Sequence, residues 1–297
     1  MARLLDTDIS QRDIEEFLET QDDFALEMFV YRVASEIGAN PRHGGTYTDP
    51  VTLKPRQFDV RVNFERSNHR ISLAIECKAL RKSFPLLVSR IPRTADESYH
   101  ELIATGGYVP GMSMLVDGTT RTVPASKVVR VIGDRSLYRL GELVGKSTAQ
   151  VGRLTATGDL TSNDGEAYEK WSQALASATD LAFAARSIRR DKDEEPIVVF
   201  VLPILVVPDD TLWVADYDDD GALFKKPTRA PEATIYVERS YGGAGETPYT
   251  VSHLQVMTRS RIETYLRTFA HADAGSHWVH VFNQTVLRAE VPSYRGS

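Results

Sequence analysis

The chain of 297 residues is 42% hydrophobic and 26% charged, which is typical of folded proteins and argues against a chain that stays disordered. Its 35 basic and 41 acidic residues give a net charge of −6, which argues against a protein that coats polyanions over its whole surface but allows a local basic groove. The single cysteine, Cys77, excludes an internal disulfide, and the longest apolar run, residues 197–208, is shorter than the roughly 20 residues of a membrane span.

The N-terminal part of the chain predicts helices followed by paired strands. Apolar residues recur at helical spacing over residues 13–37, with a break near residues 20–22 and a stop at Gly38. Over residues 47–75 the apolar period changes to two, which is typical of half-buried strands, and Asn68 marks the turn between two of them. This order of helix, strand, hairpin and strand indicates a mixed α/β layer.

Both helices and strands are expected in the remainder of the chain. Helical spacing predicts helices over residues 95–104, 164–190 and 260–270. Apolar runs predict strands over residues 197–207, 212–215, 234–238, 250–257 and 278–282. The pair Asp117-Gly118 between two apolar runs predicts a hairpin.

A change of composition divides the chain in two. Residues 1–190 are expected to form the core with its helical elaboration, and residues 191–297 a strand-rich C-terminal region. That second region either forms a unit of its own or extends the first sheet.

Two acidic residues and a lysine are the strongest candidates for chemistry. Side chains alternate along a strand, so Glu76 and Lys78 are expected on the same face. Asp59 lies between Phe58 and Val60 and is expected on the face opposite that apolar pair. If the two strands pair as neighbours, Asp59 and Glu76 converge. Taken alone, an E-x-K motif is most often an ordinary cross-strand ion pair.

Two converging carboxylates need a cation between them. Hard oxygen ligands without a usable thiolate favour Mg²⁺ or Mn²⁺, which neutralises phosphate and activates water. Lys78 beside this pair can position the attacking water and stabilise negative charge in the transition state. Glu27, on or beside the apolar face of the preceding helix, offers a third carboxylate. The alternative is a glutamate at the edge of that face that reaches solvent.

A helix glutamate, a strand aspartate and E-x-K on the paired strand, in this order, resemble the PD-(D/E)xK nuclease superfamily. The resemblance covers residues 20–105. It implies a restriction-endonuclease-like fold of the α/β (α+β) class, in which helices flank a mixed central sheet. One departure is that Phe58 precedes the aspartate where the family pattern has proline, whereas Asp49-Pro50 has the proline but lies in a turn-prone segment.

The same resemblance implies a role for each acidic residue and for the lysine. Asp59 and Glu76 are expected to be the metal ligands, and Glu27 an accessory metal-binding acid. Lys78 is expected to be the catalytic lysine.

Polar and basic residues near the predicted site are candidates for contacts with backbone phosphates. They are Arg56, Gln57, Arg81, Lys82, Arg90 and Arg93. The alternatives are an exposed strand start for the first two and a solvated loop for the other four.

These features together predict a Mg²⁺-dependent or Mn²⁺-dependent endodeoxyribonuclease of a prokaryotic restriction, defence or repair system. We expect it in the cytoplasm, because the acidic N-terminus lacks the apolar stretch of a signal peptide, and without a membrane partner. RNA or single-stranded ends are alternative substrates, and a homodimer or a partner protein is expected. The competing hypothesis is a nucleic-acid-binding or assembly module that keeps the fold without catalysis.

Overall fold

The computed structural model describes most of the chain. The described residues are 6–20, 22–49, 52–106, 112–116, 119–123, 126–163, 165–188, 194–242, 247–270, 275–291 and 294–295. Their helices are α1 (Gln11–Thr20), α2 (Phe24–Glu36), α3 (Gly165–Arg186), α4 (Arg259–Ala270), α5 (Gly275–Val281) and α6 (Gln284–Glu290), with short 3₁₀ turns at η1 (Ala95–Glu97) and η2 (Gly133–Arg135).

Strands make up most of the remaining regular structure. They are β1 (Arg42–His43), β2 (Thr46–Thr48), β3 (Pro55–Gln57), β4 (Val60–Arg66), β5 (His69–Cys77), β6 (Leu86–Pro92), β7 (Tyr99–Thr105), β8 (Met112–Val116), β9 (Thr119–Val123), β10 (Ser126–Ile132), β11 (Leu143–Arg153), β12 (Leu160–Asn163), β13 (Ile197–Val207), β14 (Leu212–Asp216), β15 (Thr228–Arg229), β16 (Glu232–Tyr241) and β17 (Tyr249–Thr258).

Most strands belong to one large mixed sheet. Its 13 strands include the path β1-β4-β5-β13-β17-β16-β11-β6-β14-β15, and β7, β10 and β12 join it at the side. β4 and β5 form an antiparallel hairpin, while β13 runs parallel to both β5 and β17. The connection from β5 to its parallel neighbour β13 includes the long helix α3, as parallel pairs require. The chain is therefore a mixed α/β protein.

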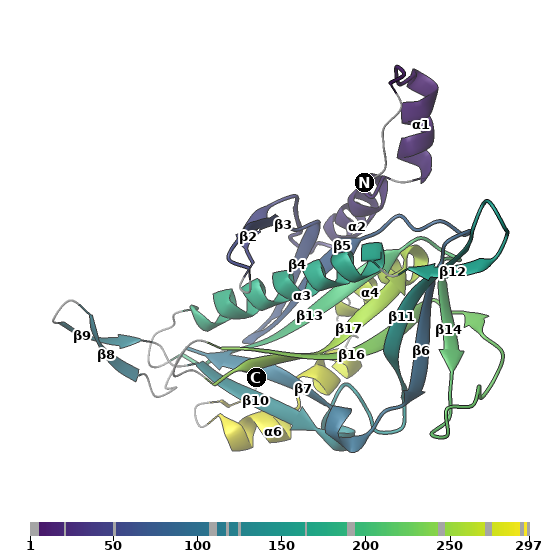
Figure 1. The fold of residues 1–297 in the computed structure, drawn as a ribbon. Coiled ribbons are helices and arrows are strands. Elements are labelled where there is room, and N and C mark those ends of the chain that lie inside the picture. Colours follow the sequence, from purple (N-terminus) through teal and green to yellow (C-terminus); the bar gives the residue numbers. More distant parts are fainter. Residues whose placement is uncertain are drawn as a thin grey trace.

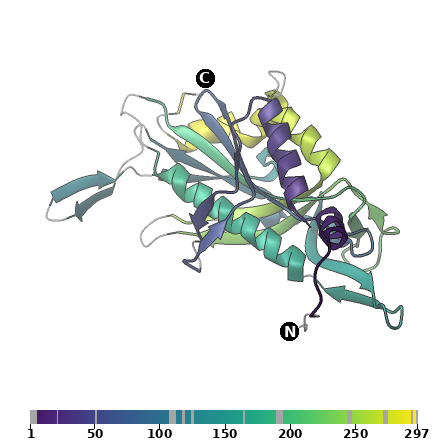
Figure 2. The ribbon, with the colours of Figure 1, turned by 90° about the horizontal axis from the view of Figure 1, so that it is seen from above.

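Helices cover both faces of the sheet (Figure 1). On one face α3 packs Leu175 and Ala178 against side chains of β5 and β13. On the other face α2, α4 and α5 share a core with β4, β5 and β13, and Figure 2 shows α2 and α4 side by side. Among the described helices none is long and apolar enough to span a membrane.

Several elements predicted from the sequence are confirmed. Residues 13–37 form two helices with a break at the expected place, and the helices predicted over residues 164–190 and 260–270 are α3 and α4. Strands β13, β14, β16 and β17 lie where apolar runs predict them. The hairpin of β8 and β9 is also present, although Asp117 and Gly118 themselves lie outside the described residues.

Two elements predicted from the sequence are wrong. Instead of a helix over residues 95–104, only η1 is helical, and the seven residues of β7 are all buried. A strand buried on both faces lacks alternation, so its spacing can resemble that of a helix. Instead of a strand over residues 278–282, the chain forms α5, because Trp278, Val281 and Phe282 contact the core at helical spacing while Val279 remains exposed.

The sheet contains strands from both sides of residue 190. β13 lies between β5 and β17, and β6 and β11, from the N-terminal part of the sequence, lie between β16 and β14. The C-terminal part also contains three helices, α4 to α6.

Candidate active site

The candidate site begins at a bend in the chain before β4. Asp59 occupies this bend rather than a regular strand position. Phe58 packs with Tyr47 and Ala176, whereas Val60 contacts the core on the other face of the sheet. The expectation that Phe58 and Val60 share a face is therefore wrong, because the bend interrupts strand alternation between them.

The hairpin register brings Asp59 and Glu76 together. Val60 pairs with Ile75, so the residues just outside this pair meet at the same end of the hairpin. Asp59 Oδ2 accepts a hydrogen bond of 2.8 Å from the backbone N–H of Cys77, and the backbone N–H of Asp59 donates to Glu76 Oε1 at 3.4 Å. Both side chains are buried, and Glu76 Oε2 has no hydrogen-bond partner.

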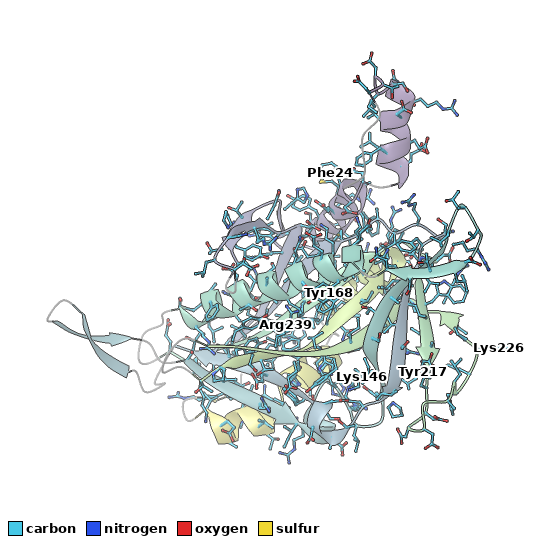
Figure 3. All side chains as sticks on the ribbon, in the orientation of Figure 1. Phe24, Lys146, Tyr168, Tyr217, Lys226 and Arg239 are labelled. Carbon is cyan, nitrogen blue, oxygen red and sulfur yellow. The ribbon has the colours of Figure 1, made fainter. Side chains whose placement is uncertain are left out.

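Lys170 on α3 is the cation that lies against this pair. Its Nζ atom lies 2.9 Å from Asp59 Oδ2, 3.8 Å from Glu76 Oε2 and 3.8 Å from Asp23 Oδ2. Burial disfavours its charged form, but the charges of Asp59, Glu76 and Asp23 outweigh that effect and raise the pKa of Lys170. Lys170 therefore stays positively charged. It lies two residues beyond Tyr168, which Figure 3 labels on α3.

A second contact between β4 and α3 fixes the helix above the site. Arg61 on β4 is buried, and its Nη1 atom lies 2.7 Å from Asp180 Oδ2. Its Nε–H also donates to Ser177 Oγ at 3.0 Å. Because Asp59 and Arg61 are only two residues apart, the strand that positions the acid also holds the helix that supplies Lys170.

Glu76 is the most perturbed carboxyl group of the site. Burial raises its pKa well above the usual value, and the nearby charge of Asp59 raises it further, with Lys170 opposing both effects. Its charge is therefore incompletely compensated by the protein. An additional cation at Oε2 would remove that deficit.

Lys78 reaches the neighbouring part of the site from the end of β5. Its Nζ atom lies 3.5 Å from Asp23 Oδ2 and 3.8 Å from Glu166 Oε2 at the start of α3. Asp23, just before α2, also accepts a hydrogen bond of 2.6 Å from the backbone N–H of Ala79. Asp23 thus joins the two lysines, since both Lys78 and Lys170 lie within 4 Å of its Oδ2 atom.

Glu27 approaches the cluster from the first turn of α2. Its Oε2 atom lies 2.9 Å from His43 Nε2, and its side chain is mostly buried. Burial raises the pKa of Glu27, and the negative charge of Asp59 raises this pKa further, because the two acids repel each other electrostatically. Glu27 therefore lies beside the pair of carboxylates, held by the histidine.

Sequence patterns alone did not identify three members of this cluster. They are Asp23, His43 and Lys170. Asp23 stands four residues before Glu27, a spacing that places both on one side of a helix start, so it could have been found. No local pattern marks Lys170, because α3 is brought to the site only by the crossover to β13.

Two of the residues predicted to contact nucleic acid lie on the small hairpin of β2 and β3. Arg56 Nε lies 3.4 Å from Asp49 Oδ2, and Gln57 Nε2 donates to the backbone oxygen of Gly44 at 3.3 Å. Both residues remain at least partly accessible to solvent.

The other four predicted contact residues separate into two groups. Arg81 is exposed in the loop after β5, and Lys82 is exposed while pairing with Asp210 at 2.9 Å. Arg90 pairs with the buried Asp216 at 2.7 Å. Arg93 is buried. Its Nη1 donates to the backbone oxygen of Arg139 and to Glu142. Both Arg90 and Arg93 are therefore engaged in ion pairs within the fold.

The donor set of the site suits a hard cation only in part. The described residues contain no group of three or more histidine, cysteine or acidic side chains arranged to hold a metal ion. The two converging carboxylates and the unpartnered Glu76 Oε2 nevertheless offer oxygen ligands of the kind that Mg²⁺ and Mn²⁺ take. Water can supply the remaining ligands of such ions.

Comparisons with known proteins identify no relative of this chain. The chain matches no model of a protein family, no curated protein and no solved structure. The site has to be interpreted from its own residues.

Proposed function

We propose that this chain is a metal-dependent nuclease of the PD-(D/E)xK kind with a restriction-endonuclease-like fold, which hydrolyses phosphodiester bonds in DNA. The observation that carries the proposal is the buried pair of Asp59 and Glu76, in which one carboxylate oxygen accepts no hydrogen bond, with Lys170 against the pair and Lys78 joined to Lys170 through Asp23. A fold that needed only an ion pair would not require two buried acids next to each other, because their mutual repulsion costs stability.

The order of elements around the pair supports the proposal. Glu27 lies on the helix before the hairpin, Asp59 just before its first strand, Glu76 at the end of its second strand and Lys78 directly after that strand. This is the order of acids and lysine on which the resemblance to PD-(D/E)xK nucleases rests.

Asp59 and Glu76 would hold the divalent ion, with Glu27 at the edge of the site. Mg²⁺ or Mn²⁺ bound there would neutralise phosphate charge and lower the pKa of a bound water. The two lysines would have different roles. Lys170 would hold Asp59 in place. Lys78, which pairs with Asp23, would direct its ammonium group to the scissile phosphate and stabilise negative charge in the transition state.

Exposed residues around the site supply contacts with the substrate backbone. Arg56 and Gln57 on β3 and Arg81 and Lys82 after β5 are accessible to solvent. Such contacts bind without reading sequence. The setting in a restriction, defence or repair system follows from the resemblance alone.

The test is cleavage by the purified chain of plasmid, linear duplex, single-stranded DNA and RNA, each with Mg²⁺, Mn²⁺ or EDTA. We expect cutting of DNA that depends on the metal and is lost in Asp59→Ala and Glu76→Ala. The matched control is Glu65→Ala. It removes an exposed acid from β4, the strand that begins directly after Asp59, and should cut normally. Absence of metal-dependent cutting on every substrate, with and without cell lysate, would reject the proposal.

One observation favours a second function, that of a binding or assembly module without catalysis. Lys170 already forms an ion pair with Asp59 and neighbours Glu76, so the protein itself supplies a positive charge to this pair. In that case nucleic acid would bind with the same affinity in EDTA and in Mg²⁺, and substitution of Lys78 would change binding only modestly.

A further inference from the structure

Helix α1 stands away from the rest of the molecule (Figure 1). All its side chains from residue 11 to residue 19 are exposed. Ile14, Phe17 and Leu18, which are 48% to 51% exposed, recur at helical spacing and form one apolar face. An amphipathic helix of this length gains little stability without a partner for that face.

An apolar groove lies on the outer side of α2, next to the start of α4. Its volume is about 460 Å³, and Ala25, Met28, Phe29 and Tyr31 provide most of its lining. Phe24, labelled in Figure 3 at the base of α1, is 54% exposed one helical turn before Met28 and extends this apolar surface toward α1.

Helix α1 is acidic and two arginines border the groove, of which Arg32 also pairs with Glu36 at 3.6 Å. The ten residues of α1 include four acidic residues and one arginine. Two arginines border the groove, and their guanidinium groups lie 5.7 Å (Arg32) and 4.3 Å (Arg259) from the centre of the Phe29 ring. An acidic amphipathic helix therefore suits this groove, because its apolar face matches the apolar lining and its acidic residues match the bordering arginines.

The connection between α1 and α2 disfavours docking within one chain. Only residues 21 and 22 separate α1 from Asp23. Asp23 is itself held by the backbone N–H of Ala79 and by Lys78. The connection between Thr20 and Phe24 is three residues long and its last residue is fixed, which is near the short end of the about two to five residues that join antiparallel helices. A second copy of the chain has no such constraint.

We propose that α1 of one copy docks into the α2 groove of a second copy, and that the reciprocal contact closes a symmetric dimer. Each copy contributes one helix and one groove, so the exchange buries both apolar surfaces of both chains. The inference does not depend on the proposed nuclease function.

The first test is sedimentation equilibrium of the full chain over a range of concentrations. We expect a dimer for the wild-type chain and at least a tenfold weaker association for Phe17→Asp and for Met28→Asp. Phe224→Asp changes a phenylalanine that is 72% exposed elsewhere on the surface and should leave the dimer intact. Circular dichroism would show that the variants remain folded.

A mixing experiment separates exchange between copies from docking within a chain. Phe17→Asp keeps an intact groove and Met28→Asp keeps an intact α1, so a mixture of the two keeps one of the two contacts and should associate more tightly than either variant alone. Added salt should weaken the wild-type dimer, because oppositely charged surfaces are screened. A wild-type chain that is monomeric at all concentrations, or a mixture that associates no more tightly than either variant alone, would overturn the proposal.

Discussion

Glu76 and Asp216 are two buried carboxylates at strand ends of the same sheet, and their side chains are both 0% exposed. For Asp216 burial raises the pKa, but Arg90 at 2.7 Å and Lys225 at 2.8 Å outweigh it and lower the pKa. For Glu76 burial and the charge of Asp59 prevail over Lys170, and the pKa is raised. The same exclusion from solvent thus accompanies opposite pKa shifts, and Glu76 is the more deeply buried of the two acids.

Besides the depth of burial, the number and position of neighbouring charges distinguish the two acids. Each oxygen of Asp216 has its own cation, at 2.7 Å and 2.8 Å, although Oδ2, like Glu76 Oε2, accepts no hydrogen bond. Glu76 shares a single cation, 3.8 Å away, with Asp59 and Asp23. A saturated carboxylate stabilises a fold, whereas a carboxylate short of positive charge is where an ion from solution can bind.

The largest effect is expected for catalysis. Lys78→Ala removes the ammonium group at the incomplete cluster while leaving Asp59 and Glu76 in place, so cleavage should fall by at least about 100-fold. Initial rates on plasmid DNA measure the loss of cleavage. Calorimetry with Mn²⁺ should give nearly unchanged metal binding.

Asp59→Ala separates metal binding from the role of Lys78. It should lose both cleavage and metal affinity, because one of few anionic ligands is removed. Wild-type cleavage by Lys78→Ala, or unchanged Mn²⁺ binding by Asp59→Ala, would show that the roles are assigned wrongly even in an active nuclease.

At the saturated carboxylate the effect should be on stability alone. Asp216→Asn leaves Arg90 without its buried counter-charge and should lower the free energy of unfolding by about 3 kcal/mol in urea titrations at neutral pH. Because the pKa of Asp216 is lowered, its contribution is present above the usual value of 3.8 and is lost as pH falls below it. A deficit that persisted equally at pH 3 would contradict this explanation, and cleavage by the folded variant should be normal.

Local patterns in the sequence are sufficient for the hairpin part of the site. The turn and the register of the hairpin bring Asp59 opposite Glu76, although the bend at Asp59 interrupts strand alternation, and the helical period places Glu27 on the helix before them. The same rules fail where burial removes the period, as in β7, or where core contacts decide between strand and helix, as in α5.

The remaining parts of the site depend on tertiary structure. Lys170 reaches Asp59 only because α3 crosses the sheet between β5 and β13. Likewise, Arg90 and Arg93 form a basic stretch in the sequence but turn inward on β6 and just after it, where acids from distant segments pair with them. A run of positive residues therefore does not reveal which side chains face solvent.

Lys170→Met should leave Glu76 with still less positive charge from the protein, while Asp216 keeps both of its cations. The substitution removes the cation nearest to Asp59 and Glu76, so the free energy of unfolding in EDTA should fall by about 2 kcal/mol. Mg²⁺ should then raise the melting temperature of the variant more than that of the wild type, because the ion replaces a missing charge. Glu169→Met, on the adjacent exposed position of α3, is the matched control. A variant as stable as the wild type in EDTA would mean that Lys170 does not compensate the pair.

The smallest effect, with the opposite sign, is expected for Glu76→Gln. The folded chain holds the proton of Glu76 at higher pH than the unfolded chain does, since its pKa is raised well above 4.5. Ionisation of Glu76 therefore costs stability increasingly as pH rises above about 4.5. In EDTA at pH 8 the variant should be more stable than the wild type by about 1 kcal/mol, and the gap should close near pH 4.5.

In Mg²⁺ the wild type should instead be more stable than Glu76→Gln. The ion stabilises the ionised Glu76 of the wild type, whereas it binds the variant more weakly because one anionic ligand is missing. Urea titrations of both chains from pH 4.5 to pH 8, with EDTA and with Mg²⁺, measure the gap. If Glu76→Gln destabilised the chain in EDTA as Asp216→Asn is expected to, Glu76 would be a saturated structural acid, and the distinction between the two carboxylates would fail.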